Sequence, residues 1–149
     1  MSVNEARTVF GRTLERARSG QAGPEEISRA LASLDAIRRQ LDGGERRQVE
    51  LYLGVLEDEW ADQVAAAHSE DAPPVLAEAQ RLARAALESG GDTAVRLDTA
   101  HRALSSLAAL SRGLADRAER LAVGRLCEPL VLLVGKLERE VESRREGAR

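Results

Sequence analysis

Two segments of the chain, residues 27–41 and 100–114, have closely similar sequences. When they are aligned at a shift of 73 residues, eight of their fifteen positions are identical. An internal repeat constrains the fold more than any short motif, because each copy is expected to form a similar structural unit. The identical pairs are Arg29/Arg102, Ala30/Ala103, Leu31/Leu104, Ser33/Ser106, Leu34/Leu107, Ala36/Ala109, Arg39/Arg112 and Leu41/Leu114.

The apolar residues are of the kinds that favour helices over strands. The chain has 149 residues, of which 43% are hydrophobic, and 25 are Ala and 21 are Leu. Only Phe10, Tyr52 and Trp60 are aromatic. Alanine and leucine are strong helix formers, whereas strands favour aromatic and β-branched residues. The composition therefore predicts an all-α fold.

Apolar residues at helical spacing, together with start and stop signals, predict three helices in each half of the chain. Ser2 and Glu5 have the spacing of a capping box, and glycines follow most of the apolar stripes. We therefore expect a six-helix bundle built from two tandem three-helix repeats. The first repeat is expected at residues 1–70 and the second at 71–149, packed together as one compact body, with a C-terminal tail that frays from about residue 143. The expected helices span about 4–18, 24–41, 45–67, 75–88, 93–114 and 117–144.

The third helices of the two copies differ most. In the second copy the sequence Pro-Leu-Val-Leu-Leu-Val at 129–134 is apolar on every face of a helix. A helix of this kind is either central in the core or covered by a partner. The second alternative marks Leu130, Val131, Leu132 and Val134 as a candidate interface. Pro129, inside this helix, predicts a kink.

The third helix of the first copy is instead acidic. Glu57, Asp58 and Asp62 form a candidate docking face for an arginine-rich partner, and a solvated helix face is the simpler alternative. Asp58 and Asp62 lie one turn apart, but no histidine or further carboxylate stands at ligand spacing. No metal site is therefore predicted.

One histidine lies inside a predicted helix. The segment that begins Ala100-His101-Arg102 and continues to Leu107 and Leu110 resembles the phosphoacceptor helix of histidine kinases. The resemblance implies His101 as the phosphoacceptor. The family places an acidic residue directly after the histidine and a proline five residues on. Here those positions hold Arg102 and Ser106.

The remaining features argue against several classes of protein. The single cysteine, Cys127, has no nearby histidine to activate it and predicts buried packing. No glycine-rich phosphate loop is present, so neither a cofactor nor a catalytic residue is predicted. The net charge is −3, with both signs interspersed, which does not favour nucleic-acid binding. The arginine-rich composition is typical of a GC-rich bacterial genome. Without a signal peptide or an apolar span, the expected location is the cytoplasm, with no membrane association.

These observations predict a non-catalytic helical protein–protein interaction module, such as an adaptor, a regulator or an assembly subunit. Its partner is another protein or a second copy of itself, bound through the last helix. The alternative is a histidine phosphotransfer or kinase-regulatory domain that uses His101. A bundle that binds an apolar small molecule between its halves is a third possibility.

Overall fold

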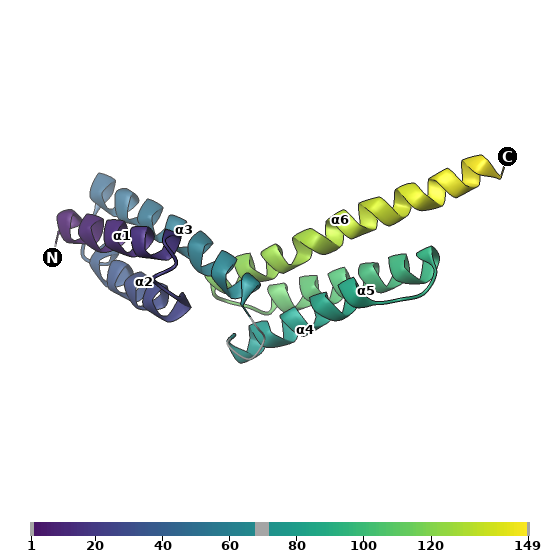
Figure 1. Cartoon of the computed structure of the whole chain (residues 1–149). Helices are drawn as coiled ribbons and strands as arrows, with labels where there is room; N and C mark the ends of the chain where they lie inside the picture. Colours follow the sequence, from purple (N-terminus) through teal and green to yellow (C-terminus); the bar gives the residue numbers. More distant parts are fainter. Residues whose placement is uncertain (1, 68–71, 149) are drawn as a thin grey trace. The chain divides into compact units, whose positions relative to one another are not determined.

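The computed structural model describes residues 2–67 and 72–148, and within them all regular structure is helical. The all-α prediction is confirmed (Figure 1). The predicted helices agree with the observed ones to within a few residues at each end. The helices are α1 (Val3–Arg18), α2 (Pro24–Arg38), α3 (Gly43–Ala66), α4 (Pro74–Glu88), α5 (Thr93–Arg112) and α6 (Arg117–Gly147).

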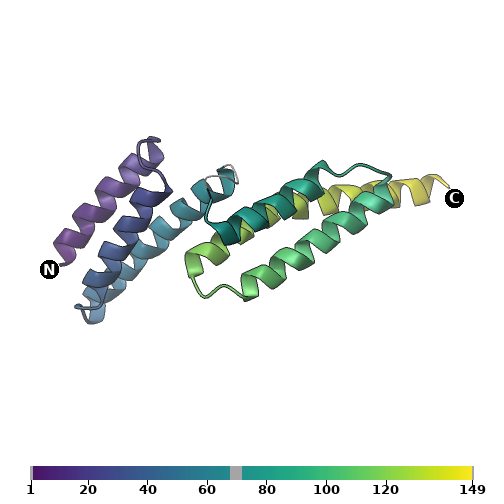
Figure 2. The ribbon, with the colours of Figure 1, turned by 90° about the horizontal axis from the view of Figure 1, so that it is seen from below.

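The chain forms two compact units, Met1–Ala66 and Ala67–Arg149. In the first unit each of α1, α2 and α3 packs against the other two. In the second unit α4, α5 and α6 make the same three pairings. The neighbours α1 and α2, and likewise α4 and α5, lie side by side in both views of the ribbon (Figures 1 and 2).

Short polar side chains begin three of the helices. The Ser2 hydroxyl accepts a hydrogen bond from the Glu5 backbone N–H at 3.4 Å, as the capping-box spacing predicts. The Asp92 carboxylate accepts one from the Val95 N–H at 2.9 Å, and Asp116 caps α6 in the same way. Because these N–H groups have no partner within the helix, each cap stabilises a helix start that the sequence already marks.

Branched aliphatic side chains fill the core of the first unit. The fully buried ones are Ile27 and Leu34 from α2 and Val49, Leu56 and Val64 from α3. At the edge of this core, the rings of Phe10 and Tyr52 stack with their centroids 4.4 Å apart. This contact joins α1 to α3.

An ion pair connects α1 with the start of α2. The Arg16 guanidinium donates through Nε and Nη2 to the two carboxylate oxygens of Glu26, at 2.9 and 3.1 Å. The hydrogen bond from Arg16 holds the pKa of Glu26 below its ordinary value. Both side chains remain partly exposed, so the pair fixes the α1–α2 connection more than it stabilises the fold.

The core of the second unit draws on all three of its helices. Leu76 of α4, Leu107 of α5 and Leu130 and Leu137 of α6 are fully buried. Gln80 is buried as well, and its side-chain amide donates to the Ala67 carbonyl at 2.9 Å. This bond ties the beginning of the unit to α4.

The burial pattern of α2 is nearly repeated in α5. At the shift of 73 residues, the buried Ile27, Ala30 and Leu34 correspond to Ala100, Ala103 and Leu107, which are also buried. A shift of 74 residues relates α3 to α6, pairing Val49 with Val123 and Leu56 with Leu130, all four of them buried. Residues that are paired at these shifts are therefore buried in both units.

The segment expected to fray lies within α6. The helix continues from Arg117 to Gly147, through the segment after residue 143. Val141 is half-buried there, and Glu140 lies near Thr93, with Oε2 3.5 Å from the threonine Oγ1. These contacts with the start of α5 support the helix beyond its last buried leucine.

Candidate functional site

The predicted interface on the last helix is divided by the helical geometry. Leu130 is fully buried, and Val134 is half-buried. In contrast, Leu132 is 74% exposed and Val131 is 57% exposed. Successive residues of an α-helix lie about 100° apart, so Leu130 and Leu132 face nearly opposite directions. The structure thus assigns Leu130 to the core and leaves Val131 and Leu132 as an outward apolar pair.

Charged residues lie one turn to either side of Leu132. Glu128 and Lys136, the only lysine in the chain, are both exposed. Arg125 Nη1 lies 3.5 Å from Glu128 Oε1. Pro129 is exposed too, and α6 is a single helix through it. The outer face of α6 therefore consists of an apolar centre between a negative and a positive side chain.

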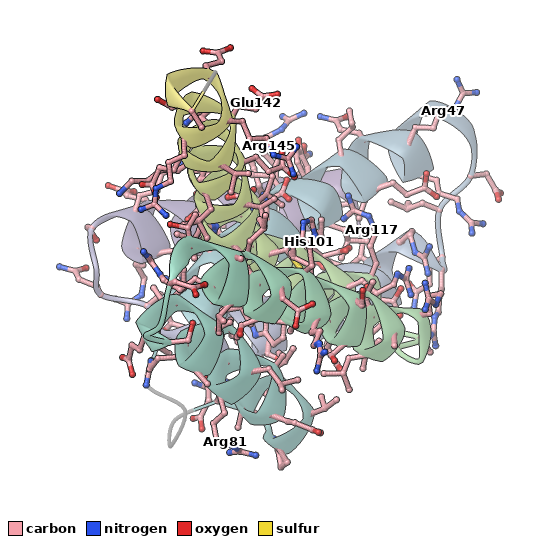
Figure 3. All side chains as sticks on the ribbon, turned by 90° about the vertical axis from the view of Figure 1, so that its right-hand side faces the viewer. Arg47, Arg81, His101, Arg117, Glu142 and Arg145 are labelled. Atoms are coloured by element: carbon pink, nitrogen blue, oxygen red, sulfur yellow. The ribbon has the colours of Figure 1, made fainter. Side chains whose placement is uncertain are left out.

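His101 lies on the exposed side of α5 (Figure 3). Its side chain is 54% exposed, and Nε2 is 3.7 Å from Glu138 Oε1 of α6. Arg102, which replaces the acidic residue of the histidine-kinase pattern, instead pairs with Asp98 of its own helix at 2.9 Å. A carboxylate does approach His101, but it comes from the neighbouring helix and not from the next position in the sequence.

The predicted acidic docking residues lie on α3. Glu57 and Asp58 are half-buried and Asp62 is exposed. Their neighbour Glu59 pairs with Arg18 of α1 at 3.2 Å. Within residues 2–67 and 72–148, no group of three or more His, Cys, Asp or Glu side chains is placed to hold a metal ion.

Cys127 is partly buried on α6. Burial raises the pKa of its thiol, because the thiolate would lose hydration. A raised pKa keeps the sulfur protonated and weakly nucleophilic at neutral pH. Among the described residues, no helix is both long enough and apolar enough to cross a membrane.

Two surface grooves were not anticipated from the sequence. One, of about 630 Å³, lies between α1 and α2, and the other, of about 570 Å³, lies between α4 and α5. Each is open along its length. Each joins the N-terminal turns of the first helix of its unit to the C-terminal turns of the second. The first is lined by Asn4, Glu5, Thr8, Val9, Ser33, Ala36 and Ile37, and the second by Val75, Glu78, Leu82, Ser106, Ala109, Leu110, Gly113 and Leu114.

Most of the residues that line the first groove correspond to residues that line the second. Five of the seven residues that line the first groove have their counterparts, at the shift of 73 residues, in the lining of the second. The sequence signal was the same shift, extended from α2 and α5 back to α1 and α4. The corresponding pairs are Glu5/Glu78, Val9/Leu82, Ser33/Ser106, Ala36/Ala109 and Ile37/Leu110.

Comparisons with protein-family models, with curated proteins and with solved structures find no significant match to this chain.

Proposed function

We propose that this chain is a helical protein–protein interaction module, built from two tandem copies of a three-helix unit, that pairs with a second copy of itself through the outer face of α6. The outward apolar pair Val131 and Leu132 carries this proposal. Large apolar side chains that lie together on a surface mark sites of association, because water leaves them when a partner covers them.

The duplication is supported by several kinds of correspondence. The same register relates identical residues of α2 and α5, their buried positions and the linings of the two grooves. Copies that share a scaffold are free to differ at their surfaces. The outward apolar pair on α6 is such a difference, since the positions that correspond to Val131 and Leu132 on α3 are the acidic Glu57 and Asp58.

A second copy is the partner that the charges around Leu132 fit. Glu128 and Lys136 each lie four residues from Leu132, on opposite sides. If two α6 helices pack antiparallel with Leu132 at the two-fold axis, Glu128 of one copy comes to the level of Lys136 of the other. The pairing is reciprocal, as a two-fold interface requires.

Replacing Leu132 with glutamate tests the pairing. A buried, unpaired carboxylate opposes association, so we expect dimerisation to weaken at least about tenfold while the helix content is unchanged. Sedimentation equilibrium of the full chain measures the dissociation constant. Leu51→Glu is the matched control, because Leu51 of α3 is 70% exposed and lies outside the proposed interface.

The single lysine provides a second measurement. An amine-reactive cross-linker is expected to join Lys136 to Lys136 of the second copy in the wild type, and much less in Leu132→Glu. A wild-type chain that stays monomeric over the whole concentration range would overturn the self-association. Equal dimerisation of the wild type and Leu132→Glu would place the interface elsewhere.

Phosphotransfer through His101 is a second candidate function. It is favoured by the exposed imidazole and by the Glu138 carboxylate 3.7 Å from Nε2. At this distance the carboxylate attracts the imidazole but accepts no hydrogen bond from Nε2. A phosphoryl group could reach the ring from solvent at this half-exposed position.

Incubation with phosphoramidate tests the second candidate. If His101 is a phosphoacceptor, the wild type is expected to gain an acid-labile phosphate and His101→Gln to lose more than about nine-tenths of it. Because residue 101 is exposed, glutamine at this position is not expected to disturb the core. Equal labelling of the two proteins, or no labelling of either, would exclude His101 as the acceptor.

A further inference from the structure

We propose that the two corresponding grooves are matched docking sites, each of which holds an amphipathic α-helix of a partner protein. The docked helix presents an apolar ridge to the groove and an Arg or Lys side chain to Glu5 or Glu78. No residue of α6 lines either groove, so this inference does not depend on the pairing through Leu132.

The shape of the grooves suits a helix. Val9 and Ile37 give the first groove an apolar floor, and Leu82 and Leu110 do the same in the second. Besides Ile37 or Leu110, the second helix of each unit contributes only a serine and an alanine to the groove. Helices pack with their axes 8–10 Å apart when small side chains let a ridge enter a groove. A docked helix would thus add a fourth helix to the unit and cover its apolar floor.

The charge of the grooves sets the chemistry of the partner. Each lining contains one charged side chain, Glu5 in the first groove and Glu78 in the second, at corresponding positions. The other lining residues are uncharged. Because the rest of the groove is apolar or weakly polar, the glutamate favours a helix that carries a cation beside its apolar ridge and disfavours one that carries a carboxylate.

The correspondence of the lining is not explained by packing. Glu5, Ser33 and Ala36 are exposed and are identical to Glu78, Ser106 and Ala109, which are also exposed. Outside the grooves some exposed positions are also identical in the two copies, such as Arg29/Arg102 and Arg39/Arg112, and others differ. Gly11 corresponds to Arg84, and Arg12 corresponds to Ala85. The identical exposed residues of the two linings give both grooves the same chemistry, so one kind of ligand suits both.

An open groove favours a helix over a small molecule. Small-molecule sites enclose most of the ligand surface, whereas these grooves are open along their length. A helix needs only one face covered, since its other face remains in water. Two sites on one chain also allow a partner with two such helices to bind more tightly than either helix alone.

The probe is a displayed library of helix-forming peptides, about five turns long, with a fixed apolar ridge and flanking positions that vary among Arg, Gln and Glu. The bait is the immobilised full chain. We expect selection to enrich peptides with arginine beside the ridge, and calorimetry of an enriched peptide to give two sites per chain. Failure to enrich any peptide, or enrichment without a preference for arginine, would overturn the proposal.

A large side chain placed in each groove tests whether the peptide binds there. Ala36→Trp and Ala109→Trp place a large ring in the first and second groove, and both alanines are exposed, so the units are expected to remain folded. Each variant is expected to reduce the stoichiometry from two to one, and the double variant to lose binding at least about tenfold. Ala32→Trp and Ser105→Trp are the matched controls, because these exposed residues correspond at the same shift and lie outside the grooves.

Reversing the charge tests the role of the glutamates. In the double variant Glu5→Lys/Glu78→Lys, selection is expected to enrich glutamate beside the ridge in place of arginine. Binding that survives the double tryptophan variant, or a preference that charge reversal does not change, would place the peptide elsewhere. The groove variants are expected to dimerise like the wild type. Loss of peptide binding and loss of dimerisation are therefore measured separately, and either proposal can fail without the other.

Discussion

Leu130→Ala is expected to lower the free energy of unfolding by about 2–5 kcal/mol, whereas Leu132→Ala is expected to change it by less than about 0.5 kcal/mol. The two leucines are two residues apart on the same helix, and the substitution is the same. The difference comes from burial alone: Leu130 is fully buried and Leu132 is 74% exposed. Alanine at position 130 removes apolar contacts and leaves a cavity, because neighbouring side chains fill the space only in part.

Urea unfolding followed by far-UV circular dichroism measures both changes. The proteins are compared at a concentration below that of dimerisation, since association would add to the apparent stability of the wild type. Leu130→Ala should move the midpoint without changing the slope. If Leu132→Ala destabilised the monomer as much as Leu130→Ala, the outward face assigned to Leu132 would be wrong.

Helix ends were predictable because their signals are local. Ser2 and Asp92 accept hydrogen bonds from N–H groups three residues on. Gly20 and Gly91 have positive φ angles of 79° and 109°, a conformation that glycine adopts at little cost. Such features depend on a few consecutive residues. The sequence therefore located all six helices without any knowledge of how they pack.

The surfaces were less predictable because they depend on pairs of helices. A run that is apolar on every face, at 129–134, does not say which side meets the core, and packing against α4 and α5 decided it. The Glu138 carboxylate near His101 is 37 residues away in the sequence. Each groove likewise joins side chains from two helices. Only the shift of 73 residues connects the two grooves in the sequence, and it was visible first in α2 and α5, where identical residues are most frequent.

Pro129→Ala is expected to raise the free energy of unfolding by about 1–3 kcal/mol. Proline has no backbone N–H, so the carbonyl of Arg125 lacks the hydrogen bond that residue 129 would donate, and the ring crowds that carbonyl. Pro129 is exposed, so little packing is lost with its ring. Urea unfolding measures the gain. Gly124→Ala is the matched control, because Gly124 is also exposed within α6 and a side chain there meets nothing within 4 Å.

The control separates the proline effect from general helix propensity. Gly124→Ala is expected to raise the stability by about 0.5–1 kcal/mol, because alanine loses less backbone entropy in a helix than glycine does. A larger gain at position 129 isolates the missing hydrogen bond and the steric conflict. A loss of stability in Pro129→Ala would mean that the ring makes packing contacts that outweigh both. Pro129 lies three residues before Leu132, so sedimentation of the same variant also shows whether the local geometry of the helix matters for pairing. Unchanged dimerisation together with higher stability would mean that Pro129 destabilises the fold and has no role in association.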